Sequence, residues 1–341
     1  MSTTVSFPGL GIGEFSLDRV AFEIFGKPVY WYGVIIMLGI VAAFVHAIIR
    51  SKREGFTPDD VLDMGIFTVL FGVLGARLYY VLTTLDTHEY KTLIDVFAVW
   101  EGGLAIYGGI IAGCTALVLT AVYKKINPLK VMDAVGPGVM LAQAIGRWGN
   151  FMNGEAFGYE VAEGSALYPF RMGLISDYTH TGNVMHFYHP TFLYESVWNI
   201  VGFIIICFLY RKKKFNGQIA LMYFAWYGFG RMFIEGLRTD SLYVGPFRIS
   251  QVVGAVCFVA GVALIIVGTL LAKQGKLDKW LTVRWAEPVP AEGQILTEDA
   301  EAEAEEAAVS EPAEETPSMP NAEGDDAAEA EESPSDDTDI E

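Results

Sequence analysis

The chain has 341 residues, 52% of them hydrophobic, and a formal net charge of −18 at pH 7. The hydrophobic residues come in blocks about 20 residues long, which is the length an α-helix needs to cross a hydrocarbon core of ~30 Å. This pattern predicts an integral membrane protein and excludes an ordinary soluble enzyme. No nucleic-acid partner is expected.

The negative charge belongs to the C-terminal segment and not to the apolar blocks. Residues 285–341 contain 21 Asp and Glu and no Lys or Arg, so the rest of the chain has 20 acidic and 23 basic residues and a net charge of +3. The segment has too few apolar residues to offset its ordering entropy by burial, which predicts disorder. It is either a solvating tail or a docking segment for a basic partner.

Seven apolar segments are expected to cross the membrane as helices, which predicts an all-α integral membrane protein. They lie at about 31–49, 61–83, 104–123, 131–150, 192–210, 217–236 and 250–272. Residues 1–30 form an outer N-terminal segment, and residues 31–272 form the transmembrane catalytic body with an outer loop region at 151–191. A basic juxtamembrane segment, 273–284, precedes the acidic tail.

Basic residues between the spans predict the orientation, because short loops rich in Lys and Arg stay in the cytoplasm. Fourteen basic residues fall on one side of the seven-span arrangement: Arg50, Lys52, Arg53, Lys124, Lys125, Lys130, Arg211, Lys212, Lys213, Lys214, Lys273, Lys276, Lys279 and Arg284. The N-terminus is therefore expected outside the cell, and the acidic tail in the cytoplasm.

A polar cluster at the end of the fourth span is the strongest functional signal. The run from Gly146 to Gly158 places an arginine, two asparagines and a glutamate among glycines. Polar groups at a membrane boundary are costly unless they bind or react with something. The outer ends of the spans also carry further polar residues: Tyr32, Arg77, Tyr107, Arg231 and Glu235. Their convergence predicts one site in the outer half of the bilayer.

Arginine in this setting indicates a phosphate ligand, because the guanidinium fork grips two phosphate oxygens at once. A lone arginine could instead place its guanidinium at the membrane–water interface without binding any ligand. Arg231 and Glu235 are four residues apart and share a helix face. They form either a structural ion pair or a phosphate ligand that the carboxylate orients, and the spacing leaves both interpretations open.

The neighbouring residues suit a close approach of backbone and ligand. Asn150 and Asn153 are three residues apart, on one face if the helix continues, and Gly158 permits close contact or a sharp turn. Because no Gly-Lys-Ser/Thr follows, the run is not a Walker loop. No cofactor or metal is predicted, since His186 and His189 lack a further ligand at a useful spacing.

The run Gly146–Gly158 closely resembles the signature of the bacterial prolipoprotein diacylglyceryl transferases. Five other segments fit the same family: Tyr30-Trp31-Tyr32-Gly33, Gly75-Ala76-Arg77-Leu78, Glu101-Gly102-Gly103-Leu104 with Gly108-Gly109, His189-Pro190-Thr191-Phe192-Leu193-Tyr194-Glu195 and Gly230-Arg231-Met232-Phe233-Ile234-Glu235. The similarity covers about residues 20–272 in the same order. The acidic tail lies outside it.

The resemblance implies a reaction and its partners. A diacylglyceryl group moves from phosphatidylglycerol to the lipobox cysteine thiol of a prolipoprotein, and glycerol phosphate leaves. The enzyme would act in the bacterial cytoplasmic membrane, on substrates that reach the outer half of the bilayer. Such chemistry needs a thiolate, and positive charge where the leaving phosphate develops negative charge.

The resemblance and the charges together imply roles for the site residues. Arg147 and Arg231 are expected to bind the headgroup phosphate, and Glu235 to orient Arg231. Asn150 and Glu155 are expected to orient the headgroup or Arg147, and Asn153 to bind the headgroup with them. Gly158 is expected to allow close approach of the backbone, and Tyr32 to contact the headgroup or line the entry to the site. Arg77 is a weaker candidate for binding the same anion.

Tyr107 departs from a common family pattern. Many members carry a histidine just before the Gly-Gly pair, where it has been considered a base. An unperturbed tyrosine has a pKa near ~10, so Tyr107 is a poor base at neutral pH, although it can donate a hydrogen bond. Either the arginines lower the thiol pKa enough, or Glu155 or another group accepts the proton. The base is left open.

Other classes of protein fit the sequence less well. A retinal protein needs a Schiff-base lysine in the last span, and residues 250–272 contain none. A phospholipid transporter would use the same arginines, but it also needs a polar path through inner span halves that are nearly free of charge. A non-catalytic scaffold gives no reason for the outer polar cluster.

Overall fold

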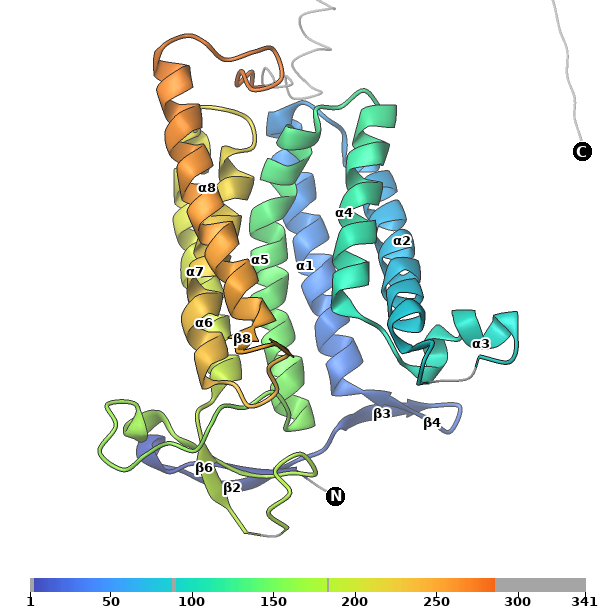
Figure 1. Cartoon of the computed structure of the whole chain (residues 1–341), viewed down its shortest axis with the longest axis vertical. Helices are drawn as coiled ribbons and strands as arrows, with labels where there is room; N and C mark the ends of the chain where they lie inside the picture. Colours follow the sequence, from blue (N-terminus) through green and yellow to red (C-terminus); the bar gives the residue numbers. More distant parts are fainter. Residues whose placement is uncertain (1–2, 88–89, 183, 286–341) are drawn as a thin grey trace, which may run out of the picture. The chain divides into compact units, whose positions relative to one another are not determined.

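The computed structural model describes residues 3–87, 90–182 and 184–285 (Figure 1). All of them belong to one compact unit, residues 1–287. The predicted disordered tail lies outside the described residues from residue 286 onward.

In the described part of the chain, seven helices have 18 or more residues. They are α1 (Trp31–Glu54), α2 (Pro58–Thr84), α4 (Ile106–Tyr123), α5 (Pro128–Asn153), α6 (Thr191–Leu209), α7 (Gln218–Leu237) and α8 (Ile249–Lys273). Their bounds lie within several residues of the expected spans. Five are long and apolar enough to cross a membrane by length and composition: α1, α2, α4, α6 with its continuation to Lys212, and α8.

The positions of the helices explain their different polarity. Helix α8 is the most apolar of the five candidate spans and also the least buried. Helix α5 packs against α1, α4, α6 and α7 and is therefore an interior helix. An interior helix faces protein and not lipid, so it can carry polar groups such as Asp133, Gln143 and Arg147.

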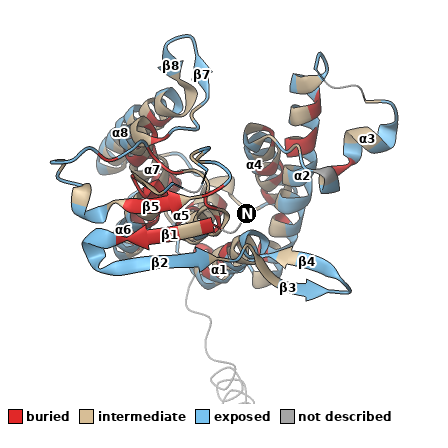
Figure 2. Ribbon diagram, turned by 90° about the horizontal axis from the view of Figure 1, so that it is seen from below, coloured by how far each residue is buried: buried red, intermediate tan, exposed pale blue. Residues whose placement is uncertain are grey.

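The helices form two groups that meet along only part of their length. Helix α1 packs closely along α5, and α2 packs closely along α4. The contacts between these two pairs are sparse, both where α1 meets α2 and where α4 meets α5. Viewed along the bundle, α2 and α4 stand apart from α6, α7 and α8 (Figure 2). Glycines allow the close pairs: a Cβ on Gly108 would lie 2.3 Å from the carbonyl oxygen of Gly75.

Short strands build a sheet at one end of the bundle, here called the head end, where α1 begins and α5 ends (Figure 1). Strands β1 (Thr3–Phe7), β2 (Ile12–Leu17), β5 (Met172–Ile175) and β6 (His186–Tyr188) pair in the order β2-β1-β5-β6. All the pairings are antiparallel. The inner face of the sheet buries Val5, Met172 and Leu174 against Phe157 and Phe192.

This sheet corrects the expectation of an all-α protein, because the chain is mostly helical with short strands. It also adds a contact that the sequence did not predict: β1 of the N-terminal segment pairs with β5 of the loop at 151–191. Two hairpins, β3 (Val20–Ile24) with β4 (Lys27–Tyr30) and β7 (Tyr243–Val244) with β8 (Phe247–Arg248), and the short helix α3 (Leu93–Phe97) complete the head end. These elements are too short to give a clear period in the sequence.

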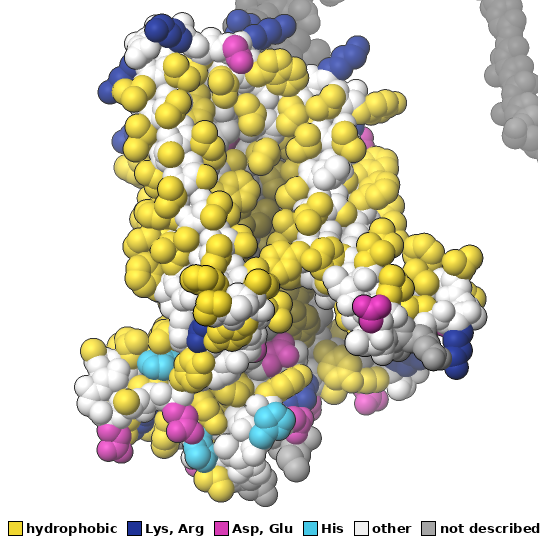
Figure 3. Space-filling model, in the orientation of Figure 1, with side chains coloured by type: hydrophobic (Ala, Val, Ile, Leu, Met, Phe, Trp, Pro, Cys, Tyr) yellow, Lys and Arg dark blue, Asp and Glu magenta, His cyan; other side chains and the backbone are white. Residues whose placement is uncertain are grey.

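Lys and Arg side chains gather at the opposite end, here called the basic end (Figure 3). A buried ion cluster joins the helices there. Lys213 Nζ lies 2.7 Å from Glu54 Oε1 and 3.0 Å from Asp133 Oδ2. Asp133 also accepts hydrogen bonds from the backbone N–H groups of Gly217 and Ala220, where α7 begins. The cluster thus ties α1, α5 and α7 together.

We expect Lys213→Ala to lower the free energy of unfolding by about 3–5 kcal/mol, because the change leaves buried carboxylates without a counter-charge. The measurement is unfolding of the detergent-solubilised protein by heat or denaturant. Lys212→Ala is the matched control, since Lys212 is exposed. Equal stability of the two variants would contradict the role assigned to Lys213.

Candidate active site

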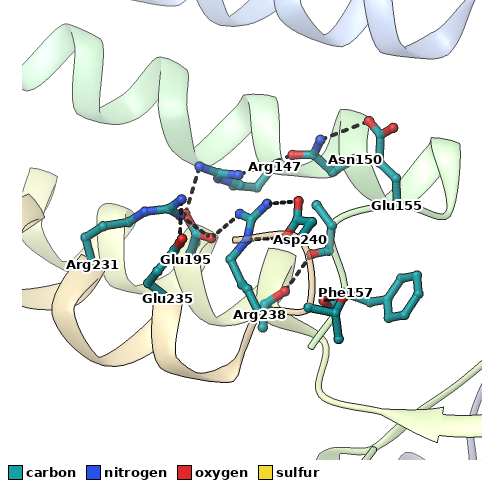
Figure 4. A network of polar contacts seen from close by, with 12 residues as sticks. Arg147, Asn150, Glu155, Phe157, Glu195, Arg231, Glu235, Arg238 and Asp240 are labelled. Carbon is teal, nitrogen blue, oxygen red and sulfur yellow. Dashed lines mark hydrogen bonds and ion pairs between the residues drawn. The ribbon is translucent and has the colours of Figure 1, made fainter. Parts of the chain in front are cut away.

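A buried glutamate from the first turns of α6 lies at the centre of the site. The side chain of Glu195 is 4% exposed and forms ion pairs with three arginines (Figure 4). Its partners are Arg147 Nη2 at 2.8 Å, Arg231 Nη1 at 3.1 Å and Arg238 Nη1 at 3.0 Å. These arginines come from α5, from α7 and from the segment just after α7, so one carboxylate fixes three parts of the chain.

Two further carboxylates, those of Glu235 and Asp240, pair with Arg231 and Arg238 through guanidinium nitrogens that do not contact Glu195. Arg231 Nη2 lies 2.6 Å from Glu235 Oε2, the pair that shares a helix face in the sequence. Arg238 donates to Asp240 through Nε at 2.9 Å and through Nη2 at 2.7 Å. Burial raises the pKa of Asp240, but the hydrogen bonds and charge of Arg238 outweigh it and hold that pKa below its usual value.

Three arginines and three carboxylates give this cluster no net formal charge. Each guanidinium has five N–H donors, and the contacts above do not use all those of Arg147. An anion can therefore bind to guanidinium groups whose directions are already set by the carboxylates. Preorganised donors of this kind need no large rearrangement when the ligand arrives.

The end of α5 brings Glu155 back over its own last turn. Gly154 ends the helix in the left-handed conformation with φ 65°, which glycine adopts readily. Glu155 Oε1 then accepts hydrogen bonds from Asn150 Nδ2 and Asn153 Nδ2, each at 3.1 Å. Asn150 Oδ1 lies 3.4 Å from Arg147 Nη1, so this chain of contacts leads from Glu155 to the first arginine.

A cavity of about 550 Å³ opens beside Arg147 and runs between α1, α2, α4 and α5. Tyr32, Arg147 and Asn150 line one part of it, and most of the remaining lining is apolar. The space-filling view shows the molecule hollowed between the two groups of helices (Figure 3). The arrangement offers a cationic, hydrogen-bonding end and a long apolar body, which matches an amphipathic ligand with an anionic head.

The structure places most of the expected site residues around these two features. Tyr32 lines the cavity, and Tyr107 is the second residue of α4, beside Ile106, which also lines it. The backbone N–H of Gly158 donates to the carbonyl of His189 at 2.9 Å. A Cβ on Gly158 would lie 2.7 Å from the carbonyl oxygen of Leu237, so the close approach at this glycine is to the protein's own chain.

Arg77 lies in a different environment from the other predicted anion ligands. Its guanidinium donates to the backbone carbonyls of Asp95 at 2.6 Å, Val96 at 2.9 Å and Gly102 at 2.7 Å. In this structure it holds the segment between α2 and α4, and it does not line the cavity. Its role in substrate binding stays a prediction without a contact to support it.

Glu195, Arg238 and Asp240 were not assigned a role from the sequence. Glu195 ends the matched run 189–195 and lies next to an apolar block, where an ionisable residue is costly unless it is paired. That signal was available for Glu195. Arg238 and Asp240 follow α7 in a polar segment, and nothing in their spacing separates them from surface residues. Among the described residues, no group of three or more His, Cys, Asp and Glu could hold a metal ion.

These features define a helical membrane protein with an arginine site beside an apolar cavity. The chain matches the model of the prolipoprotein diacylglyceryl transferase family over residues 19–267. It is 44% identical over 252 residues to the phosphatidylglycerol–prolipoprotein diacylglyceryl transferase of Streptococcus uberis, covering 73% of this chain and 95% of the relative. The enzyme of the same name from Enterococcus faecalis is 43% identical over 256 residues, covering 74% of this chain and 90% of the relative. The one from Listeria innocua is 41% identical over 261 residues, covering 75% of this chain and 92% of the relative.

The chain therefore belongs to the prolipoprotein diacylglyceryl transferase family, as the resemblance in its sequence predicted. It is a membrane transferase, and its apolar helices agree with that setting.

Proposed function

We propose that this protein transfers the diacylglyceryl group of phosphatidylglycerol to the lipobox cysteine of a prolipoprotein, the first step of lipoprotein maturation. The observation that carries the proposal is the position of Arg147 at the polar end of the apolar cavity. A phospholipid has the same two parts: a phosphate that a guanidinium binds well and chains that suit an apolar space. The names of the relatives at 41–44% identity support the choice of substrates.

The reaction is a substitution at the glyceryl carbon bonded to the phosphate. The cysteine sulfur forms a bond to that carbon, and the carbon–oxygen bond to phosphate breaks. The bonding electrons leave with the phosphate oxygen, and glycerol phosphate is released. The thiol proton passes to a base, so the products are a thioether and a protonated base or leaving group. The enzyme must therefore favour a thiolate and stabilise charge on the leaving phosphate.

The site residues divide into groups that contact the lipid and groups that position them. Arg147 and Arg231 bind the headgroup phosphate, and Tyr32, Asn150 and Asn153 contact the headgroup. Glu195 and Glu235 orient the two arginines through the ion pairs described above. Glu155 fixes Asn150 and Asn153, which supports its role in orienting the headgroup or Arg147.

The proposed location is the bacterial cytoplasmic membrane, with all seven long helices crossing it. Helices α5 and α7 would then be interior spans whose polar residues face protein. The head end would lie outside and the basic end in the cytoplasm, because the 14 basic residues named above follow the charge rule for cytoplasmic loops. The active site would then lie in the outer half of the bilayer, where both substrates reach it.

A transfer assay with the purified protein in detergent tests the proposal. It combines phosphatidylglycerol with a lipobox peptide and follows glycerol phosphate release and peptide mass. We expect release with a mass gain of one diacylglyceryl group, and we expect Arg147→Ala to reduce the rate by at least about 100-fold, as removing one donor to a developing anion does elsewhere. Lipid binding without release, across several lipobox peptides, would favour a lipid transporter.

Tyr107→Phe tests whether this tyrosine acts as the base. We expect the variant to keep a rate within about tenfold of the unchanged protein, because a tyrosine hydroxyl is a poor general base at neutral pH and the change removes only a hydrogen-bonding group. The readout is thiol alkylation of the peptide, with Arg147→Ala measured beside it. Equal loss of activity in both variants would assign Tyr107 an essential proton transfer.

A further inference from the structure

A fourth arginine, Arg248, lies next to the end of α7, the helix that carries Arg231 and Glu235 to the site. It is the last residue of β8 and directly precedes the first residue of α8. Its side chain is half-buried, and the ion pairs among the described side chains do not include it. Its positive charge is therefore satisfied by groups other than carboxylates.

The guanidinium of Arg248 binds the turn that follows α7. Its Nη1 donates to the backbone carbonyl oxygen of Glu235, in the last turn of the helix, and to that of Arg238 at 3.4 Å. Its Nη2 donates to the hydroxyl oxygen of Tyr159 at 3.1 Å. Three acceptors from two separate segments of the chain thus surround one guanidinium group.

The chemistry of this position favours arginine. The last carbonyl groups of a helix have no partner within the helix and carry partial negative charge, so a cation is stabilising there. The guanidinium fork also binds several acceptors at fixed angles, which the ammonium of a lysine does not. Its carbon Cζ lies 5.8 Å from the ring centroid of Tyr159 and 5.5 Å from that of Tyr243, and these rings further limit its direction.

The turn that Arg248 holds carries two charged side chains of the site. Glu235 and Arg238 lie at its two ends, and Figure 4 shows both side chains directed toward the cluster around Glu195. Glu235 pairs with Arg231, and Arg238 pairs with Glu195. The backbone N–H of Arg238 donates to the carbonyl oxygen of Glu235 at 3.2 Å, so a shift at one end of this tight turn moves the other end.

The same contacts join this turn to the segment that follows α5. The backbone N–H of Tyr159 donates to the carbonyl oxygen of Leu237 at 2.8 Å, and its hydroxyl accepts from Arg248. Gly158 and Arg238 face each other in an isolated antiparallel β-bridge. Arg248 therefore fixes the turn after α7 relative to the end of the run Gly146–Gly158.

We propose that Arg248 is a positioning residue of the phosphate site. It holds the turn after α7, and thereby the directions of Glu235 and Arg238, without touching the ligand. The identity of the phosphate ligand rests on the proposed function. A misplacement of ~1 Å in an active site lowers a rate by up to roughly 100-fold, so a small shift of this turn has a measurable effect.

Arg248→Lys tests the proposal, because lysine keeps the positive charge but loses the fork that binds three acceptors. Arg171→Lys is the matched control. Arg171 also lies at the head end, donates to the carbonyl oxygen of Tyr168 at 3.0 Å and has its Cζ 4.0 Å from that ring centroid. Its other ring contact is with Phe187, outside the charged cluster. All variants are compared by thermal unfolding before use.

The readouts are transfer to the lipobox peptide and direct binding of phosphatidylglycerol and of diacylglycerol with the same acyl chains. We expect Arg248→Lys to weaken phosphatidylglycerol binding and to lower kcat/KM, each by about tenfold or more. Diacylglycerol binding should not change, because this lipid has no phosphate for the arginines to bind. Arg171→Lys should match the unchanged protein in all three measurements.

A double-mutant cycle with Arg238→Lys tests whether Arg248 acts through the turn. Once Arg238 is replaced, the loss of its positioning should cost little more, so the double variant should lose clearly less activity than the product of the two single losses. Two losses that multiply would show that Arg248 and Arg238 act independently, and would contradict the proposal.

Two further results would overturn it. One is unchanged phosphatidylglycerol binding and transfer in folded Arg248→Lys. The other is an equal weakening of phosphatidylglycerol and diacylglycerol binding, which would indicate a general disturbance of the fold. Phosphatidylglycerol binding that Arg248→Lys weakens, without transfer in the unchanged protein, would instead support the positioning role and contradict the proposed function.

Discussion

One buried carboxylate, that of Glu195, forms ion pairs with three arginines from separate parts of the chain, and the geometry of the whole site depends on it. A charge at 4% exposure is costly to bury unless partners compensate it. Here three guanidinium groups do so, and Glu235 and Asp240 balance their excess charge. The arginines are consequently held in fixed directions before any ligand is present, which is how a protein stabilises a developing phosphate charge without reorganisation.

The two ends of the bundle use buried charge for different purposes. At the basic end, Lys213 satisfies Glu54 and Asp133 and leaves no cavity-lining charge, so that cluster joins helices. At the head end, the charged cluster has no net formal charge, but one of its side chains, that of Arg147, lines the cavity. Between these ends lies an apolar cavity whose walls are α1, α2, α4 and α5. The sparse packing between α2–α4 and α1–α5 is therefore what leaves the cavity open.

The sequence predicted the positions of the seven long helices to within several residues, although only five of them are long and apolar enough to be candidate membrane spans, and α5 and α7 are not among these five. It did not predict the sheet that joins β1 to β5, since the strands are short and about 165 residues apart in the chain, a pairing that depends on how the bundle folds. Arg147, Arg231 and Glu235 were predicted as site residues from charge at the ends of spans and from the family resemblance, and the structure brings them into one ion-pair cluster. Arg77 has the same signal but binds backbone carbonyls, and Glu195 became central only when three helices met. Spacing along one chain cannot distinguish these cases.

The kinetics of Glu195→Gln test the central claim most directly, because this change removes the charge and keeps the size of the side chain. The account predicts a loss of at least about 100-fold in kcat/KM for phosphatidylglycerol, as expected when one partner of a buried charge network is removed at a cost of ~3–5 kcal/mol. Glu160→Gln, a change at an exposed position, should have no such effect. A Glu195→Gln enzyme that folds and transfers at the unchanged rate would contradict the claim that this carboxylate aligns the arginines.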